Sequence, residues 1–374
     1  MIQTLLVKLA PSQEQHQALL TTMERFNEAC NYISQLAFEH HTAGQVKLHH
    51  LAYRYLREHY GLSAQMAVRC VGKVVEVYRR DKSKLYIFKP HSAMVFDSRI
   101  LSFKGLDNIS ILTLQGRQII PIRIGEYQEA RINRIVRQCD LILRKGIFYL
   151  AVTVDAPEPA PDDPTGALGV DLGIVHIAVD SDGEFYSGEQ VDKVREKTSK
   201  LKASLQSRGT KSAKRHLKKL SGKEASFRRN TNHVISKRLV AKAKCTSRLI
   251  ALEDLKGIRQ RTKVRKSQRQ RHQSWAFSQL RHFIAYKARL AGVLVKLVDP
   301  KHTSQTCPRC GFVSKHNRVS QSSFVCKLCG FCLNADLAGA INIAQRAMST
   351  SLLPRTPPFG EVPGASPLAL AVGG

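Results

Sequence analysis

Three acidic side chains stand in stretches of the sequence where a carboxylate is unusual. Asp171 lies in the apolar run 167–173, which otherwise suits a buried strand, and Glu253 repeats this arrangement in the run 249–255. Asp336 opens a helical pattern over 336–343. Because a buried carboxylate is costly without a cation, these acids predict a metal site. Two Mg²⁺ ions about 4 Å apart, held by Asp171, Glu253 and Asp336, would activate a water and stabilise the leaving oxygen of a phosphodiester. The pattern predicts a nuclease with these catalytic residues.

A second metal site is predicted from the cysteines between the second acid and the third. Two Cys-x-x-Cys-Gly knuckles are separated by 15 residues, the spacing of a zinc ribbon, and they are formed by Cys307, Cys310, Cys326 and Cys329. Disulfides would not be expected in a cytoplasmic chain, and neither disulfides nor inert thiols would explain the paired spacing. Cys332 offers an alternative second pair with Cys329, but only Cys326 and Cys329 keep the following glycine. We therefore expect one structural Zn²⁺, with Cys332 as a bystander.

The charge of the chain predicts a nucleic-acid partner. Lys and Arg number 59 against 29 acids, a formal net charge of +30. Residues 193–271 contain 27 of these basic residues, and the acids in that stretch are Glu196, Glu224, Glu253 and Asp254. A solvated helical face usually mixes both signs, whereas phosphate neutralisation needs one. Arg228, Arg229 and Lys237 are weak candidates for nucleic-acid contacts, since exposure to solvent explains each of them equally well.

Neither the apolar runs nor the N-terminus predicts a membrane protein. No run approaches the roughly 20 residues needed to span a bilayer, and no signal-peptide pattern opens the chain. We expect a cytoplasmic, nucleoid-associated protein. The remaining thiols stand in apolar helical or strand contexts and predict buried, unpaired cysteines at Cys30, Cys70, Cys139 and Cys245.

The N-terminal half predicts a small β-barrel with helices inserted into it. A strand at 4–9 is followed by Ser12 and Gln15, which form a capping box for a long helix, and further helices are expected at 48–59 and 64–80. Short strands follow at 85–88, 100–103, 109–114, 119–124, 139–144 and 147–154. Pro121 restricts the fourth of these to a sheet edge, and residues 144–146 predict a hairpin turn. The predicted domains are a barrel of 1–11 and 84–155, a helical insertion of 12–83 and a linker of 156–165.

The C-terminal half predicts an α/β domain of the RNase H-like class. The strand that bears Asp171, a second strand at 174–180 and a third near 184–186 precede basic helices, a fourth strand that bears Glu253, a basic loop at 256–271, a helix at 275–291 and a fifth strand at 293–298. This order predicts a nuclease domain of 166–303 and 333–347 with the zinc ribbon, 304–332, inserted. Residues 348–374 are rich in Pro, Gly and Ser and predict a flexible tail.

Five motifs in this order resemble the TnpB (OrfB) proteins of insertion sequences, which are compact relatives of type V CRISPR nucleases. They are Gly-Val-Asp171-Leu-Gly, Leu-Glu253-Asp-Leu, Tyr286-Lys-Ala, the Thr-Ser-Gln-Thr run that ends at Cys307, and Asn-Ala-Asp336-Leu-Ala-Gly-Ala-Ile-Asn-Ile. The match is strong over residues 166–346. The resemblance departs at Ala338 and Gly339, where many members have Asn and Ala, and we expect altered packing there and an intact metal site.

The resemblance implies a RuvC-like domain with wedge and recognition domains before it. It also implies a transposon-encoded DNA endonuclease, often described as a transposase, guided by an RNA transcribed from the transposon end and cutting target DNA beside a short adjacent motif. Two other functions stay open on the same scaffold: an RNA-guided repressor without nuclease activity, and an RNA-independent transposase or resolvase. The sequence does not indicate an oligomeric state.

Overall fold

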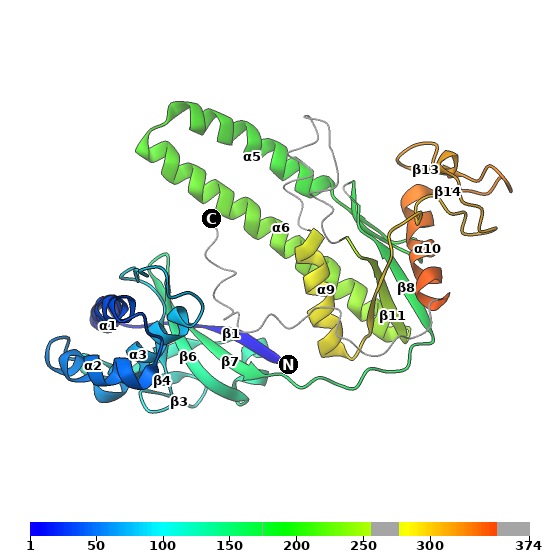
Figure 1. Ribbon diagram of the computed structural model, residues 1–374. Coiled ribbons are helices and arrows are strands. Elements are labelled where there is room, and N and C mark those ends of the chain that lie inside the picture. The colour runs from blue at the N-terminus through cyan, green and yellow to red at the C-terminus, as the bar shows by residue number, and fades with distance from the viewer. Residues whose placement is uncertain (174, 256–276, 350–374) are drawn as a thin grey trace. The chain divides into compact units, whose positions relative to one another are not determined.

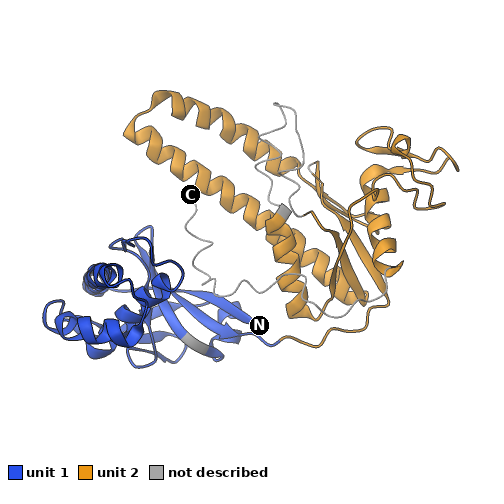
Figure 2. Cartoon of the chain, in the orientation of Figure 1, with its two compact units in different colours: residues 1–157, 366–374 blue, residues 158–365 orange. Residues whose placement is uncertain are grey.

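The computed structural model describes residues 1–173, 175–255 and 277–349, and these form parts of two compact units. The first unit contains residues 1–157 and the second begins at Glu158 (Figure 2). Expected features at 256–276, among them the basic loop, and the expected tail from residue 350 lie outside the described residues. No helix within the described ranges is long and apolar enough to span a membrane.

The first unit combines a helical insertion with one curved run of paired strands (Figure 1). Its sheet has seven strands in the order β2-β6-β7-β1-β5-β4-β3, without a closing pair between the two ends among the described residues. Closure into a barrel therefore stays a prediction. The elements are β1 (Ile2–Leu9), α1 (Gln13–Glu39), α2 (Gln45–Glu58), α3 (Ala64–Tyr78), β2 (Met94–Phe96), β3 (Leu101–Lys104), β4 (Asn108–Thr113), β5 (Gly116–Arg123), α4 (Glu126–Ile132), β6 (Ile135–Arg144) and β7 (Ile147–Asp155).

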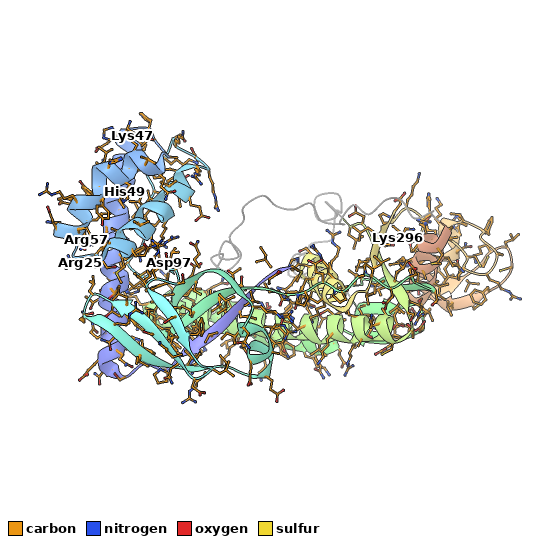
Figure 3. The ribbon with its side chains drawn as sticks, turned by 90° about the horizontal axis from the view of Figure 1, so that it is seen from below. Arg25, Lys47, His49, Arg57, Asp97 and Lys296 are labelled. Carbon is orange, nitrogen blue, oxygen red and sulfur yellow. The ribbon has the colours of Figure 1, made fainter. Side chains whose placement is uncertain are left out.

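Local sequence signals account for the starts of two of the three inserted helices, α1 and α3. Ser12 and Gln15 form the expected capping box at the start of α1, and the Ser63 hydroxyl accepts a hydrogen bond from the Met66 N–H at the start of α3. Arg25 lies on α1, and Lys47, His49 and Arg57 lie on α2 (Figure 3). Buried apolar side chains of α1 and α3 join those of the sheet in one core.

Two expectations for this half are wrong, and so is one for a cysteine of the second unit. Residues 85–88 form no strand, because α1 side chains take up their backbone groups: Asn31 both donates to the Phe88 carbonyl and accepts from its N–H, and Ser34 donates to the Tyr86 carbonyl. Pro121 is not in an edge strand, since β5 lies between β1 and β4. Along β5, pairing with β4 ends at Pro121 and pairing with β1 starts at Ile122. The N–H that proline lacks therefore falls where β5 changes from one neighbouring strand to the other. Cys245 is exposed, whereas the Cys30, Cys70 and Cys139 thiols are buried.

The second unit is built on a five-stranded sheet in the order β10-β9-β8-β11-β12. The first three strands in the chain pair antiparallel, whereas β11 pairs parallel to both β8 and β12, which is the strand order expected for an RNase H-like domain. The elements are β8 (Gly166–Asp171), β9 (His176–Asp180), β10 (Phe185–Ser187), α5 (Glu189–Arg208), α6 (Lys211–Cys245), β11 (Arg248–Glu253), α9 (Phe277–Ala291), β12 (Val295–Val298), η1 (Lys315–Asn317), β13 (Ser323–Val325), β14 (Cys332–Asn334) and α10 (Ala335–Ser349).

Helices cover both faces of this sheet, and α5 and α6 form a long antiparallel hairpin that extends beyond its edge (Figure 1). One face packs on α6 and α9, through residues such as Leu168, Leu252 and Ile284. The other face packs on α10, where Leu249 and Ala251 contact Ile343. On that side Lys296 of β12 donates to the Ala347 carbonyl near the end of α10 (Figure 3).

Candidate active site and metal centre

The alternation of side chains along β8 and β11 places two of the predicted acids on one face of the sheet. Leu252 lies opposite Val170 in the parallel ladder, so Glu253 and Asp171 follow at the same level. Since Val170 and Leu252 face α6 and α9, the residues after them face α10. Asp254 points the other way and its carboxylate pairs with Arg281 of α9 at 3.2 Å. The sheet therefore separates Glu253 from its acidic neighbour.

The helix α10 brings the third acid to the same place. The Asn334 side chain accepts hydrogen bonds from the N–H groups of Asp336 and Leu337, and this caps the start of the helix, so that Asp336 lies in its first turn. A Cβ on Gly169 would lie 2.0 Å from the Ala340 carbonyl oxygen, so the helix approaches β8 only because glycine stands there. One residue nearer to Asp336, a Cβ on Gly339 would lie 3.2 Å from Asp171 Oδ2.

The three acids are close enough to change one another's electrostatics. Desolvation and, after it, the charges of Glu253 and Asp336 raise the pKa of Asp171 to about 8. Desolvation also raises the pKa of Glu253, although a hydrogen bond from Thr303 opposes that rise. An Arg318 nitrogen lies 3.4 Å from Asp336 Oδ1 and supplies positive charge next to the acids. The three carboxyl groups lie close together and are largely removed from water, so a divalent cation would stabilise the site that they form.

The residues present fit magnesium as a ligand set. All three donors are carboxylates, which are the oxygen ligands that a hard cation prefers.

The four predicted zinc cysteines form a compact tetrad. The sulfur atoms of Cys307, Cys310, Cys326 and Cys329 all lie within 4.8 Å of one another, and the 307–329 and 310–326 pairs are 3.7 and 3.6 Å apart. Four thiolates at the usual Zn–S distance of about 2.3 Å would lie about 3.8 Å apart at tetrahedral corners, so the tetrad can bind zinc. Cys332 lies outside this group; it is exposed, and its thiol donates to the Gly330 carbonyl.

The two knuckles have the same backbone design. Gly311 and Gly330 take positive φ angles of 76° and 72°, and each N–H returns to the carbonyl of the first cysteine in its knuckle. Desolvation opposes ionisation of the Cys326 thiol, but the backbone N–H groups of Cys329 and Leu328, together with the thiols of Cys329 and Cys310, outweigh it and lower its pKa to about 6. This favours the thiolate that a metal requires.

The ribbon packs directly on the helix that bears the third acid. Ala338 is buried in one cluster with Cys307, Phe324 and Cys326, where the small side chain lets the ribbon lie against α10. The departure from the family pattern at residue 338 therefore falls in packing between ribbon and helix. Gly339 instead leaves room next to Asp171.

The basic residues are concentrated on the helical hairpin. Several of them along the first turns of α6 are exposed and form no salt bridge with a carboxylate in the described part of the chain: Lys211, Lys214, Arg215, Lys218 and Lys219. The weak candidates Arg228, Arg229 and Lys237 lie further along α6. Arg229 and Lys237 are exposed; the charge of Arg229 acts on His233 of the same helix, whereas that of Lys237 acts on Lys287 of α9.

Two residues near the acids were not expected from the sequence. Arg318 comes from the ribbon and contacts Asp336, and no local pattern distinguishes it from other surface arginines. Thr303 donates its hydroxyl hydrogen to Glu253, and the signal that could have found it is its place in the Thr-Ser-Gln-Thr run directly before Cys307. Both come to the site through chain segments that are remote in sequence.

Two family models match the second half of the chain. The model of OrfB of IS605, described as "Probable transposase", matches residues 149–260. The model of the Cas12f1-like TNB domain matches residues 277–343, which contain α9, the ribbon and the start of α10.

Named relatives agree with these models. The chain is 32% identical over 238 residues to the CRISPR-associated endodeoxyribonuclease Cas12f1 of Sulfoacidibacillus thermotolerans, covering 59% of this chain but 54% of that protein. It is 28% identical over 240 residues to InsQ of Escherichia coli K12, which carries the name of a putative RNA-guided DNA endonuclease; the match covers 58% of each. A TnpB-like protein of Methanocaldococcus jannaschii is 31% identical over 265 residues, which are 66% of this chain and 93% of that protein.

The first of these relatives is much longer than the matched region, and the chain spans about half of its length. The M. jannaschii protein, in contrast, is matched over nearly its whole length. Together with the order of the motifs and the matching OrfB model, this similarity assigns the chain to a family: it is a member of the TnpB (OrfB) family.

Proposed function

We propose that the protein is an RNA-guided, metal-dependent DNA endonuclease with Asp171, Glu253 and Asp336 as its catalytic residues. The observation that carries this proposal is that two strand ends and one helix start deliver these acids to one desolvated place. Carboxylates that share such a place can hold the two ions that phosphodiester cleavage uses. Relatives whose names denote an endodeoxyribonuclease and an RNA-guided DNA endonuclease support the same substrate.

The side chains of the site have separate tasks in this proposal. Magnesium held by the three carboxylates would activate a water and stabilise the leaving oxygen. Arg318 can contact a phosphate oxygen of the strand through its guanidinium, because 32% of its side chain stays exposed while it also reaches Asp336. The four thiols of the ribbon would complete a closed, structural zinc site and leave no open position for catalysis. The task of the ribbon in this proposal is therefore to hold Arg318 in place.

The exposed basic residues at the start of α6 are the proposed contact for the guide RNA and target DNA. They can neutralise phosphates without breaking existing salt bridges, so binding gains the full release of counterions. In such a system base pairing supplies the sequence information, while the protein contributes backbone contacts and reads a short adjacent motif. The first unit is the proposed location of that reading.

The test is cleavage of double-stranded DNA in Mg²⁺ with and without RNA transcribed from the adjoining transposon end. We expect site-specific cleavage only with the RNA. Each of Asp171→Ala, Glu253→Ala and Asp336→Ala should abolish cleavage and leave RNA binding intact, whereas the matched control Asp254→Ala should keep most activity because Asp254 faces α9. RNA-guided binding without cleavage would indicate a repressor, and equal specific cutting in both arms would indicate a free-standing nuclease or resolvase.

A further inference from the structure

One hydroxyl group connects the zinc ribbon to the second acid. Thr303 is 3% exposed and its Oγ1 donates to Glu253 Oε1. A second acceptor, the Pro300 carbonyl, lies 3.0 Å from the same hydroxyl. A hydroxyl has one hydrogen to donate, so an ionised Glu253 competes for it with a neutral carbonyl and forms the stronger, charge-assisted bond.

The loop that carries Thr303 is held to α10 by side chains on one face of that helix. Asn342, itself 4% exposed, donates to the carbonyls of Thr303 and Thr306, both at 2.7 Å. One turn further along, Arg346 donates to the carbonyls of Asp299 and Lys301 at 2.6 and 2.8 Å. The loop from the end of β12 to Cys307 is thus tied at four carbonyls to the helix that bears Asp336.

Through this loop, the folded ribbon can influence the position of the acids in addition to binding zinc. Cys307 directly follows the loop, and Thr306 forms a bridge with Val313 inside the ribbon. The position of the Thr303 hydroxyl is therefore set by α10 on one side and by the folded ribbon on the other. Without that hydroxyl, one oxygen of Glu253 loses its described hydrogen-bond partner and the carboxylate gains freedom to rotate.

We propose that Thr303 is a positioning residue that orients the Glu253 carboxylate for its divalent cation and so couples the folded ribbon to the acid site. The proposal rests on the proposed function of the acids as magnesium ligands. Removing a partner that orients a metal ligand costs about 10-fold to 100-fold in metal affinity or activity. We expect a loss in that range for Thr303→Val, which keeps the shape of the side chain and removes the hydroxyl.

The measurement that does not depend on cleavage is Mn²⁺ binding to the full chain, followed by the electron paramagnetic resonance of free Mn²⁺. Binding at the acid site is taken as the difference from Asp171→Ala. Thr303→Ser keeps a hydroxyl and should rescue binding. Thr306→Val is the matched control, because its hydroxyl donates to the His302 carbonyl in the same loop and not to an acid. Zinc content is measured in every variant.

The expected result is a dissociation constant for Mn²⁺ raised about tenfold or more in Thr303→Val, with Thr303→Ser and Thr306→Val within about twofold of the unmodified chain and zinc retained in all. The Mg²⁺ concentration for half-maximal cleavage should shift in parallel. Normal Mn²⁺ binding in Thr303→Val, or equal loss in Thr303→Ser, would overturn the proposal. Thr303→Ala is made as well; if both it and Thr303→Val release zinc, the hydroxyl supports the ribbon alone and the proposal is wrong. An unmodified chain that binds Mn²⁺ but cuts no DNA would refute the proposed function separately.

Discussion

Neutralising Asp171 should stabilise the magnesium-free protein, and more so at high pH. The pKa of this carboxyl is raised from 3.8 to about 8 in the folded chain, so the folded state holds a proton that the unfolded state releases between those values. Stability from this group is present at low pH and is lost as the pH rises through that window. At about 1.4 kcal/mol per pKa unit, the free energy of unfolding is lowered by about 2 kcal/mol at pH 5 and by about 5 kcal/mol at pH 8, relative to a pH below both pKa values.

Asp171→Asn removes the titration while keeping the side-chain shape. The unfolding of the second unit is followed by calorimetry between pH 5 and pH 8, with zinc bound and without magnesium. Since about 1 kcal/mol shifts the Tm of a unit this size by about 2–4 °C, the variant should gain several degrees over the unmodified protein between pH 5 and pH 8. Asp254→Asn serves as control, because Asp254 lies on the opposite face of the sheet and pairs with Arg281.

The difference between the variant and the unmodified protein is the quantity to compare, because other carboxylates titrate in both. A difference that stays constant from pH 5 to pH 8, or that shrinks as the pH rises, would refute the desolvation argument. The advantage of Asp171→Asn should also disappear in Mg²⁺, since only the unmodified site then binds the cation. Persistence of the advantage in saturating Mg²⁺ would show that the acids do not hold it.

Three further outcomes follow from other side chains. Cys326→Ser should lose zinc and loosen the ribbon, while Cys332→Ser should keep about one zinc per chain, as metal analysis would show. Gly169→Ala should prevent stable folding of the second unit, because its Cβ would lie 2.0 Å from a backbone oxygen of α10; Gly222→Ala, in open space on α6, should be neutral or stabilise by up to about 1 kcal/mol in thermal unfolding. Replacing three exposed lysines by glutamine should reduce the salt dependence of RNA binding. The slope of the logarithm of the binding constant against the logarithm of the salt concentration should become shallower by about 0.7–0.9 for each phosphate that is no longer neutralised, and an unchanged slope would place the RNA elsewhere. These are Lys214, Lys218 and Lys219.

The sequence alone determined the features that depend on local spacing. The Ser12 capping box, the Lys145-Gly146 turn with both residues at positive φ, and the two cysteine knuckles were all predictable, because each is complete within a few residues. The strand order of the second unit also followed from its elements, since parallel strands need a helix between them and hairpins do not. The residue types Asp, Glu and Cys in apolar or knuckle contexts predicted two metal sites, and the four cysteines do gather as that prediction requires.

Only the tertiary structure decided which groups surround the acids and with what effect. A non-local contact leaves no period in the sequence, so the Thr303–Glu253 hydrogen bond and the approach of Arg318 to Asp336 could not be predicted from patterns. For the same reason the prediction of a strand at 85–88 was wrong, because Asn31 and Ser34 of the remote helix α1 satisfy backbone groups of this segment. The raised pKa of Asp171 likewise arises from desolvation in the folded chain and from carboxylates that are 82 and 165 residues away in the sequence. Residue types and local spacing thus identify candidate site residues, whereas only the folded chain brings these residues close enough to interact.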